Sequence, residues 1–358
     1  MAQSKGKKAQ KKQLPVTQIF LCAAVLIVAV LIVTIFTSRN IKTDRTVLAS
    51  SAQENVLLRH YMYFLNSMRF EYENSWASYG YAQSAEEMSA LWKTVEDGLT
   101  FWEHLKLYAL ESAQGIMTEL HIAKQSGYNE TSDLIARTDA EIDEVVNSVF
   151  PGSNTPNTDF YKAYGLTINE MKVLQRYINL VNDWRNDIFE KTTVSDDAAL
   201  AYFESNREMI DSVVARHILL MTDDLEGEEK DPVYEFACDL LDQINEGADI
   251  GELAAIYSDD GGSAENNGEY EFGRNEMVPE FEDWAFSAEV GDTGIVESSY
   301  GYHIMQLMRA PYTFDELKDE VINAVKSEAA TASIEDAVAN AGIDWKLNES
   351  AFGKINMN

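Results

Sequence analysis

The chain has 358 residues, enough for two or three domains, and carries 28 Lys and Arg against 60 Asp and Glu, a formal net charge of -32. The first 45 residues hold eight of the basic residues and one acidic residue, which leaves 20 basic and 59 acidic residues for the remainder. Such an acidic body repels nucleic acid and anionic lipid headgroups, so nucleic acid is excluded as a partner. The two cysteines, Cys22 and Cys238, are too few for a disulfide framework.

The N-terminal part of the sequence predicts a membrane anchor. Residues 1–14 form a Lys-rich tail, and residues 15–38 form an uncharged segment in which residues 19–36 are almost wholly apolar. At about 1.5 Å per residue, these 18 residues span about 27 Å, close to the thickness of a hydrocarbon core. The basic excess before the segment predicts a single-pass protein of the cell membrane, with a cytoplasmic N-terminus and an extracytoplasmic body.

Two other interpretations of this segment are less favoured. In a secretory signal, the cleavage site directly follows a shorter apolar region, whereas here Arg39, Lys42 and Arg45 come before the small residues near Ala49. Lipidation of Cys22 would need an apolar signal region ahead of it, and the preceding residues are rich in lysine. We therefore expect an uncleaved anchor.

Residues 46–210 predict a helical domain. Ser/Thr-x-x-Glu signatures of helix starts occur at Ser51, Ser84, Thr100 and Thr167, before apolar residues at helical spacing. The domain is rich in aromatic residues, among them Tyr61, Tyr63, Phe64, Phe70, Tyr72, Trp76 and Trp102. The rings fit either an ordinary helical core or a groove for extended chains, and the sequence leaves both open.

Residues 211–310 predict a compact α+β domain with four strands and flanking helices. The pattern indicates strands at 213–221, 269–272, 293–297 and 301–308, and helices at 231–247, 249–257 and 278–286. The loop 258–268 is rich in Gly, Asp and Asn. Residues 311–358 return to a helical pattern, and we expect this C-terminal segment to pack on the helical domain.

Two histidines lie within the predicted strands and point into apolar surroundings. The period of two places His217 on one face with Leu219, and His303 on one face with Met305. Buried imidazoles need hydrogen-bond partners, and a mutual hydrogen bond across the strands would satisfy both. Whether the pair serves chemistry or only braces the sheet stays open at this point.

Four linked motifs of this domain resemble the parvulin-type peptidyl-prolyl cis-trans isomerases. They are "ARHILL" at 215–220, "LAAIYSDDGGSAENNG" at 253–268, "FGRNEMVPEFEDWAF" at 272–286 and "GIVESSYGYHIMQL" at 294–307. The wider order of a helical region, this domain and a C-terminal helix is similar to that of extracytoplasmic foldases of the SurA and PrsA type. The resemblance implies that residues 46–210 are chaperone-like. It also implies that the protein isomerises prolyl bonds in unfolded or partly folded exported polypeptides, without a cofactor.

The resemblance also assigns site residues. The implied catalytic residues are His217, Asp260, Ser298 and His303, and the implied substrate-binding residues are Tyr270, Met277 and Phe281. Met277 and Phe281 would form the floor of a pocket for the proline ring, where polarizable and flat apolar surfaces are suitable. Tyr270 stands where the family has a pocket leucine, because "GEYE" at 268–271 replaces the usual Gly-Asp-Leu-Gly and the segment is one residue short.

Other kinds of site are not supported by the sequence. The loop lacks the acceptors of a calcium-binding loop, and the pattern shows no nucleophile elbow, phosphate loop or zinc signature. A metal held by His217, His303 and Asp260 has no short-range ligand spacing. The function expected is therefore a membrane-anchored prolyl isomerase for exported proteins. The alternative is a non-catalytic chaperone whose parvulin-like domain is degenerate.

Overall fold

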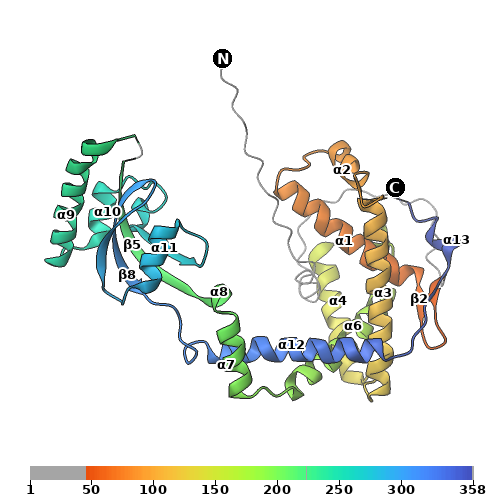
Figure 1. Ribbon diagram of the computed structural model, residues 1–358. Helices are drawn as coiled ribbons and strands as arrows, with labels where there is room; N and C mark the ends of the chain where they lie inside the picture. The colour runs from red at the N-terminus through yellow and green to blue at the C-terminus, as the bar shows by residue number, and fades with distance from the viewer. Residues whose placement is uncertain (1–45, 223, 357–358) are drawn as a thin grey trace. The chain divides into compact units, whose positions relative to one another are not determined.

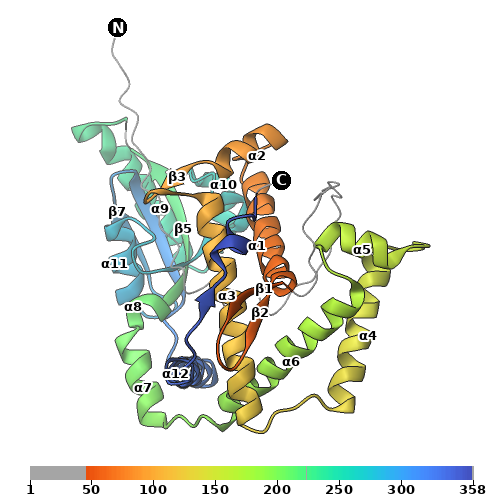
Figure 2. The ribbon, with the colours of Figure 1, turned by 90° about the vertical axis from the view of Figure 1, so that its right-hand side faces the viewer.

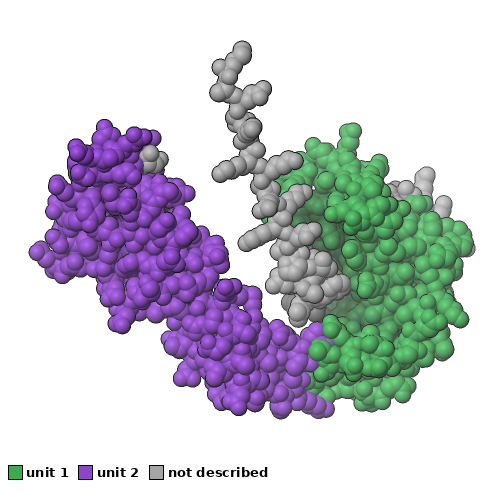
Figure 3. Space-filling model, viewed as in Figure 1, with its two compact units in different colours: residues 1–188, 332–358 green, residues 189–331 purple. Residues whose placement is uncertain are grey.

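The computed structural model describes residues 46–222 and 224–356, which fall into two compact units (Figure 1, Figure 3). The first unit contains the described residues up to Ile188 together with those from Ala332 onward, and the second contains Phe189–Thr331. The predicted tail 1–14 and the predicted anchor 15–38 lie outside the described residues. Among the helices of the described ranges, none combines the length and the apolarity needed to cross a membrane.

The first unit is mainly helical and also holds short strands. Its elements are β1 (Val47–Ser50), β2 (Asn55–Leu57), α1 (Leu58–Ser78), α2 (Ala85–Trp92), β3 (Val95–Glu96), β4 (Leu99–Thr100), α3 (Phe101–Gln125), α4 (Ser132–Val149), α5 (Pro156–Tyr164), α6 (Ile168–Lys191), β9 (Lys346–Leu347) and α13 (Glu349–Phe352). The last residues of α6 already belong to the second unit. Strand β2 lies beside α3 (Figure 1, Figure 2).

The core of the first unit joins residues from both ends of the chain. Tyr61 of α1, Leu120 of α3 and Trp184 of α6 are buried in one cluster. The C-terminal segment completes this cluster with Ile355, because β9 pairs with β1 in a sheet of order β2-β1-β9. Trp345 donates from Nε1 to the Thr118 hydroxyl at 3.2 Å.

The prediction that a helix starts at Ser51 is wrong. Ser51 instead begins the turn of the β1–β2 hairpin, where its hydroxyl accepts from the backbone N–H of Glu54 at 2.9 Å, and α1 starts only at Leu58. A serine that accepts from the N–H three residues on suits a turn as well as a helix start. The Glu54 carboxylate does not complete a capping box and lies 3.5 Å from Lys124 Nζ.

The other three predicted helix starts are confirmed. Ser84 and Thr100 form reciprocal capping boxes with Glu87 and Glu103 at the starts of α2 and α3. Thr167 and Glu170 exchange the same pair of hydrogen bonds at the start of α6.

The second unit holds the predicted α+β fold. Its elements are α7 (Asp196–Ser205), α8 (Arg207–Ile210), β5 (Ser212–Met221), η2 (Gly227–Lys230), α9 (Asp231–Asn245), α10 (Ile250–Tyr257), η3 (Ala264–Asn266), β6 (Glu269–Gly273), α11 (Pro279–Ser287), β7 (Thr293–Glu297), β8 (Gly301–Arg309) and α12 (Lys318–Ala339). The last residues of α12 belong to the first unit. The predicted order of strands and helices between 213 and 309 is confirmed.

One antiparallel sheet of order β6-β5-β8-β7 forms the centre of this unit. Helices α9 and α10 cover one face, where Ile218 and Ile304 are buried, and α11 covers the other, where Ala215 and Met305 are buried (Figure 1). The start of β5 lies beside the end of β8, because Arg309 donates from Nη1 to the Ser212 carbonyl at 3.1 Å.

A separate small core joins α7 to the first part of α12. Phe203 of α7 and Val321 of α12 are buried together with Ala199. These contacts place α7 and α8 in the second unit, whereas the sequence analysis puts the domain boundary at 210/211.

Candidate active site

Two buried histidines lie on the central strands of the four-stranded sheet. The register between β5 and β8 aligns His217 with Met305 and Leu219 with His303, so the histidines are diagonal neighbours on the face that α11 covers. Their Nδ1 atoms are 3.2 Å apart, and the rings stack with centroids 5.4 Å apart. The predicted hydrogen bond between the two imidazoles is confirmed.

Each histidine also contacts a polar side chain at its other ring nitrogen. His303 Nε2 lies 2.7 Å from Ser298 Oγ, and His217 Nε2 lies 3.0 Å from Asp260 Oδ2. An ionised carboxylate can only accept, so His217 Nε2 carries the proton. His217 Nδ1 then accepts from His303 Nδ1–H, and His303 Nε2 accepts from the Ser298 hydroxyl. One pair of tautomers of neutral imidazoles satisfies all three contacts.

The surroundings keep both imidazoles neutral. Burial lowers the pKa of His303 to about 4, aided by the charge of a protonated His217 and opposed by Asp260. Burial likewise lowers the pKa of His217, although the hydrogen bond and the charge of Asp260 oppose it. A protonated His217 would point its Nδ1–H at the Nδ1–H of His303, so the contact survives protonation only if His303 moves its own proton to Nε2 and donates to the Ser298 hydroxyl.

The loop before β6 carries the carboxylate to this network. It runs along the second half of β5, where Asp259 donates its N–H to the Leu219 carbonyl at 2.8 Å and His217 donates its N–H to the Gly268 carbonyl at 2.8 Å. Gly268 has a φ of +69°, and an added Cβ would lie 2.2 Å from the His217 carbonyl oxygen. A side chain at this position would therefore push the loop away from the histidines.

Asp260 is held as an anion by several donors. Its carboxylate accepts from Ser263 Oγ at 2.5 Å, Gly262 N–H at 3.0 Å, His217 Nε2 at 3.0 Å and the Tyr270 hydroxyl at 3.0 Å. Burial of the carboxyl raises its pKa, but these hydrogen bonds outweigh the effect and lower the pKa to about 2. A fixed negative charge therefore lies at one end of the histidine pair.

Phe281 forms an apolar floor beneath both imidazoles. Its side chain is 3% exposed, and its ring meets His217 edge-on at 5.1 Å and His303 at 5.3 Å between centroids. Phe281 lies in the first turns of α11, which begins at Pro279, and Met277 precedes this helix in the same core cluster. The site therefore joins a flat apolar surface to a line of polar groups.

The structure brings most of the predicted site residues together. Ser298, His303, His217 and Asp260 form one hydrogen-bonded line, Tyr270 joins it at Asp260, and Phe281 lies against the histidines. Met277 shares the core cluster of Phe281. The roles given to these seven residues remain predictions.

Ser263 is a member of the network that the sequence analysis missed. Its side chain is fully buried and contacts Asp260 Oδ2 and His217 Nε2. The spacing Asp260-x-x-Ser263 could have indicated it, because a turn brings a carboxylate and a hydroxyl three residues on into contact.

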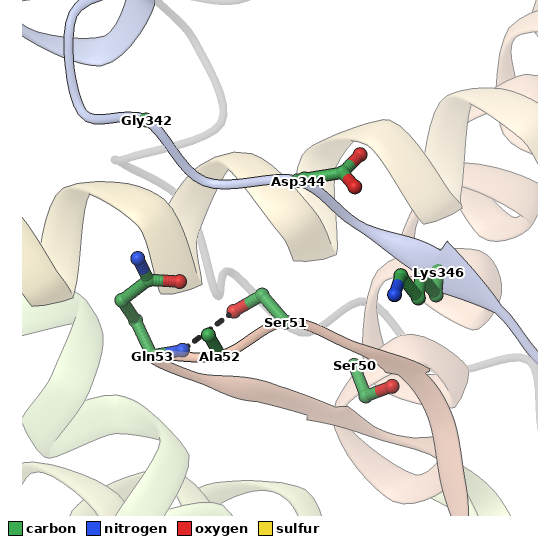
Figure 4. A pocket seen from close by; sticks show the side chains of 7 residues that line it. All are labelled: Ser50, Ser51, Ala52, Gln53, Gly342, Asp344 and Lys346. Carbon is green, nitrogen blue, oxygen red and sulfur yellow. Dashed lines mark hydrogen bonds between the residues drawn. The ribbon is translucent and has the colours of Figure 1, made fainter.

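Two cavities lie away from this network. One of about 370 Å³ lies in the first unit, between the β1–β2 hairpin and the C-terminal segment, and its polar lining includes Ser51, Gln53, Asp344 and Lys346 (Figure 4). Another, of about 380 Å³, lies beside α8 and includes Arg207 and Arg274. Within residues 46–222 and 224–356, no group of His, Cys, Asp and Glu side chains is arranged to bind a metal ion.

Comparison with known proteins identifies the domain. The family described as "PPIC-type PPIASE domain" matches residues 198–310. The foldase protein PrsA of Halalkalibacterium halodurans is 33% identical over 187 residues, which are 51% of this chain and 53% of that protein. PrsA of Oceanobacillus iheyensis is 28% identical over 58% of this chain and 68% of that protein. The crystal structure of PrsA from Bacillus cereus aligns with 72% of this chain and 94% of its own, at 23% identity and a TM-score of 0.31.

Residues 198–310 therefore match the family of PPIC-type, or parvulin-type, peptidyl-prolyl cis-trans isomerase domains. The predicted resemblance to this enzyme class is confirmed. More particularly, the chain is similar to the foldase protein PrsA, and the similar part spans about half of the first of these relatives and about two thirds of the second.

Proposed function

We propose that the protein is a membrane-anchored peptidyl-prolyl cis-trans isomerase that assists the folding of exported proteins. Its substrates are unfolded or partly folded polypeptides that contain proline. The observation that carries the proposal is the line from Ser298 through both histidines to Asp260, which lies above the Phe281 ring in a PPIC-type domain. The name foldase of its relatives supports a role in folding, and the predicted anchor 15–38 supports a location at the membrane.

The reaction breaks no covalent bond. Its barrier of about 18–20 kcal/mol is the loss of amide resonance, and uncatalysed exchange at proline takes tens to hundreds of seconds. A site accelerates the exchange by binding the twisted amide better than either planar form. Phe281 and Met277 are suited to hold the proline ring on an apolar surface while the rest of the bond rotates.

Asp260 is suited to act on the electronic structure of the amide. Resonance places negative charge on the carbonyl oxygen, and a nearby carboxylate disfavours that charge. The twisted amide carries less negative charge on this oxygen, so the carboxylate destabilises the twisted amide less than the planar amide. The neutral histidine pair keeps the Asp260 carboxylate in place at one end and the Ser298 hydroxyl at the other.

Cis–trans exchange of a short proline peptide, measured by NMR on the full chain in detergent micelles, tests the proposal. The wild type should accelerate exchange above the uncatalysed rate. Asp260→Asn should lower kcat by about tenfold or more and leave peptide binding nearly unchanged, because its role is in the transition state. Asp283→Asn makes the same change at an exposed position of α11 and should have no effect. A folded wild type that binds the peptide without accelerating exchange would contradict the assignment.

The second candidate is a chaperone that binds unfolded chains without catalysis. It is favoured by exposed rings at the C-terminal end of α1 and just after it, where Tyr79 is 76% exposed and Tyr81 is 63% exposed. Phe70 and Tyr72 of α1 are also exposed, whereas Tyr61 of the same helix lies in the core. Contiguous exposed rings are typical of interaction surfaces.

Suppression of aggregation of a non-native test protein distinguishes the two activities. The double variant Tyr79→Ser/Tyr81→Ser should weaken suppression and leave prolyl exchange unchanged. Tyr161→Ser, which removes an exposed ring of α5, is the matched control. Equal suppression by wild type and double variant would show that these rings do not bind clients.

A further inference from the structure

Tyr270 makes a contact that the family resemblance does not predict. It lies on β6 opposite Ala215 of β5, and its hydroxyl donates to Asp260 Oδ2 at 3.0 Å. Its ring also lies beside that of His217, with centroids 5.7 Å apart. The leucine expected at this position has no hydroxyl and could not make the hydrogen bond.

Gly262 provides the space for this contact. A Cβ at residue 262 would lie 2.6 Å from the Tyr270 hydroxyl oxygen and 3.2 Å from Asp260 Oδ1. The first distance is shorter than any ordinary contact, so a side chain here would displace the hydroxyl. Gly262 does not have a left-handed φ, so the lack of a side chain, rather than an unusual backbone, is what the tyrosine requires.

The donors around Asp260 come from different parts of the fold. Ser263 and Gly262 belong to the same loop as Asp260, so their hydrogen bonds shape the loop itself. His217 on β5 is the group that the carboxylate orients. Tyr270 joins the carboxylate to β6, which is paired with β5 over five residue pairs. The loop carboxylate is thereby tied to the sheet from two adjacent strands.

We propose that the Tyr270 hydroxyl, which Gly262 admits, is a positioning group that holds the Asp260 carboxylate toward His217. This inference rests on the proposed isomerase function. It also gives the "GEYE" segment a role at the polar end of the site. The tyrosine replaces a wall of the proline pocket by a hydrogen bond to the polar end of the site. Tyr270 and Gly262 then act as a pair, because the tyrosine can reach Asp260 only where residue 262 has no side chain.

Tyr270→Phe removes the hydroxyl and keeps the ring, so it is the principal test. In the full chain, kcat for a proline peptide should fall about fivefold while KM stays within about twofold, because the change affects the carboxylate and not the pocket floor. The pKa of the Asp260 carboxyl, followed by ¹³C NMR and assigned with Asp260→Asn, should rise because a donor to the anion is lost. Gly262→Ala should produce the same changes, and adding it to Tyr270→Phe should change little more.

Five outcomes decide the inference. Two results together support the positioning role: Tyr270→Phe has a lower kcat and a higher Asp260 pKa, and the double variant Tyr270→Phe/Asp260→Asn has the same kcat as Asp260→Asn alone. A silent Tyr270→Phe overturns it, and so does a change confined to KM, which would make the tyrosine a pocket wall. If the wild type itself has no turnover, the proposed function fails, and an unchanged Asp260 pKa in Tyr270→Phe would then separately overturn the positioning role. If the wild type has no turnover but the Asp260 pKa rises in Tyr270→Phe, the tyrosine holds the carboxylate without serving catalysis, and positioning for catalysis is overturned.

Discussion

At the scale of single residues, the neutral histidine pair makes the site sensitive to acid. An unfolded histidine has a pKa of about 6.5, whereas the pKa of His303 in the folded protein is lowered to about 4. Between these values the unfolded chain binds protons that the folded protein does not. The contribution of the group to stability is therefore fully present above pH 6.5 and is lost as the pH falls toward 4.

Acid should thus loosen the sheet that carries the site. Amide hydrogen exchange of β5 and β8 should report an opening free energy that declines between pH 6.5 and 4, with His303 contributing up to about 3 kcal/mol. His303→Gln should make this decline shallower, because the variant has no group that titrates there. His121→Gln in the first unit is the matched control and should follow the wild type. An equally steep decline in His303→Gln would contradict the explanation.

The Phe281 ring supports both histidines, so its loss should affect activity and stability together. Phe281→Ala should lower kcat/KM by at least about tenfold and the free energy of unfolding by about 3–5 kcal/mol, because a large buried side chain is removed. Phe281→Leu keeps most of the volume. Expressed as a free energy, its loss of kcat/KM should exceed its loss of unfolding free energy. Phe286→Leu makes the same change on α11 in a ring that packs on Phe272 and should preserve activity. Similar kcat/KM losses in both leucine variants would show that the floor has no special role.

At the scale of elements, α1 carries a polar side chain that its surroundings do not satisfy. His60 is 4% exposed, and neither ring nitrogen has a hydrogen-bond partner among the residues that the structure describes. Burial lowers its pKa to about 4, aided by the charge of Arg59 and opposed by Glu170. The imidazole loses its hydration without gaining a hydrogen bond, although its ring meets Tyr177 edge-on.

An apolar residue at this position should stabilise the first unit. His60→Leu should raise the free energy of unfolding by about 1–3 kcal/mol at pH 7, because the buried polar atoms are removed. The gain should be larger at pH 5, where the unfolded chain of the wild type takes up a proton at His60 and the folded protein does not. Urea denaturation followed by far-ultraviolet circular dichroism measures it, with His121→Leu as the control. A loss of stability in His60→Leu would mean that the ring nitrogens are satisfied in solution.

The sequence predicted the α+β domain better than the helical one, for a physical reason. In β5 and β8 the period of two places His217 and His303 on one face, and burial fixes that register, so their contact could be predicted. At Ser51 the local pattern fits both a helix start and a turn, and the pairing of β1 with β9, almost 300 residues away along the chain, decides between them. The Tyr270 contact could not be predicted either, because it depends on the space left at Gly262.

At the scale of the whole molecule, the topology is still a prediction. If residues 15–38 anchor the chain with its N-terminus in the cytoplasm, protease added to cells with a permeable outer envelope should digest the body. A tag at the N-terminus should stay protected until the membrane is dissolved. The Lys-rich tail is the reason for this expectation, because basic residues favour the cytoplasmic side. Protection of the body against protease would reverse the orientation.

The adjacency of the two ends of the sheet domain has a consequence for how the chain folds. Ser212 at the start of β5 lies within hydrogen-bond reach of Arg309 at the end of β8, so about a hundred residues leave and return at nearly one point. The folded domain therefore brings the segments on either side of it close together, as a tight turn would. Closing a flexible loop of that length costs several kcal/mol of entropy, and prior folding of the domain removes that cost. Folding of the domain therefore brings Phe203 of α7 and Val321 of α12 close together, and we expect the small core between these helices to form after the sheet domain.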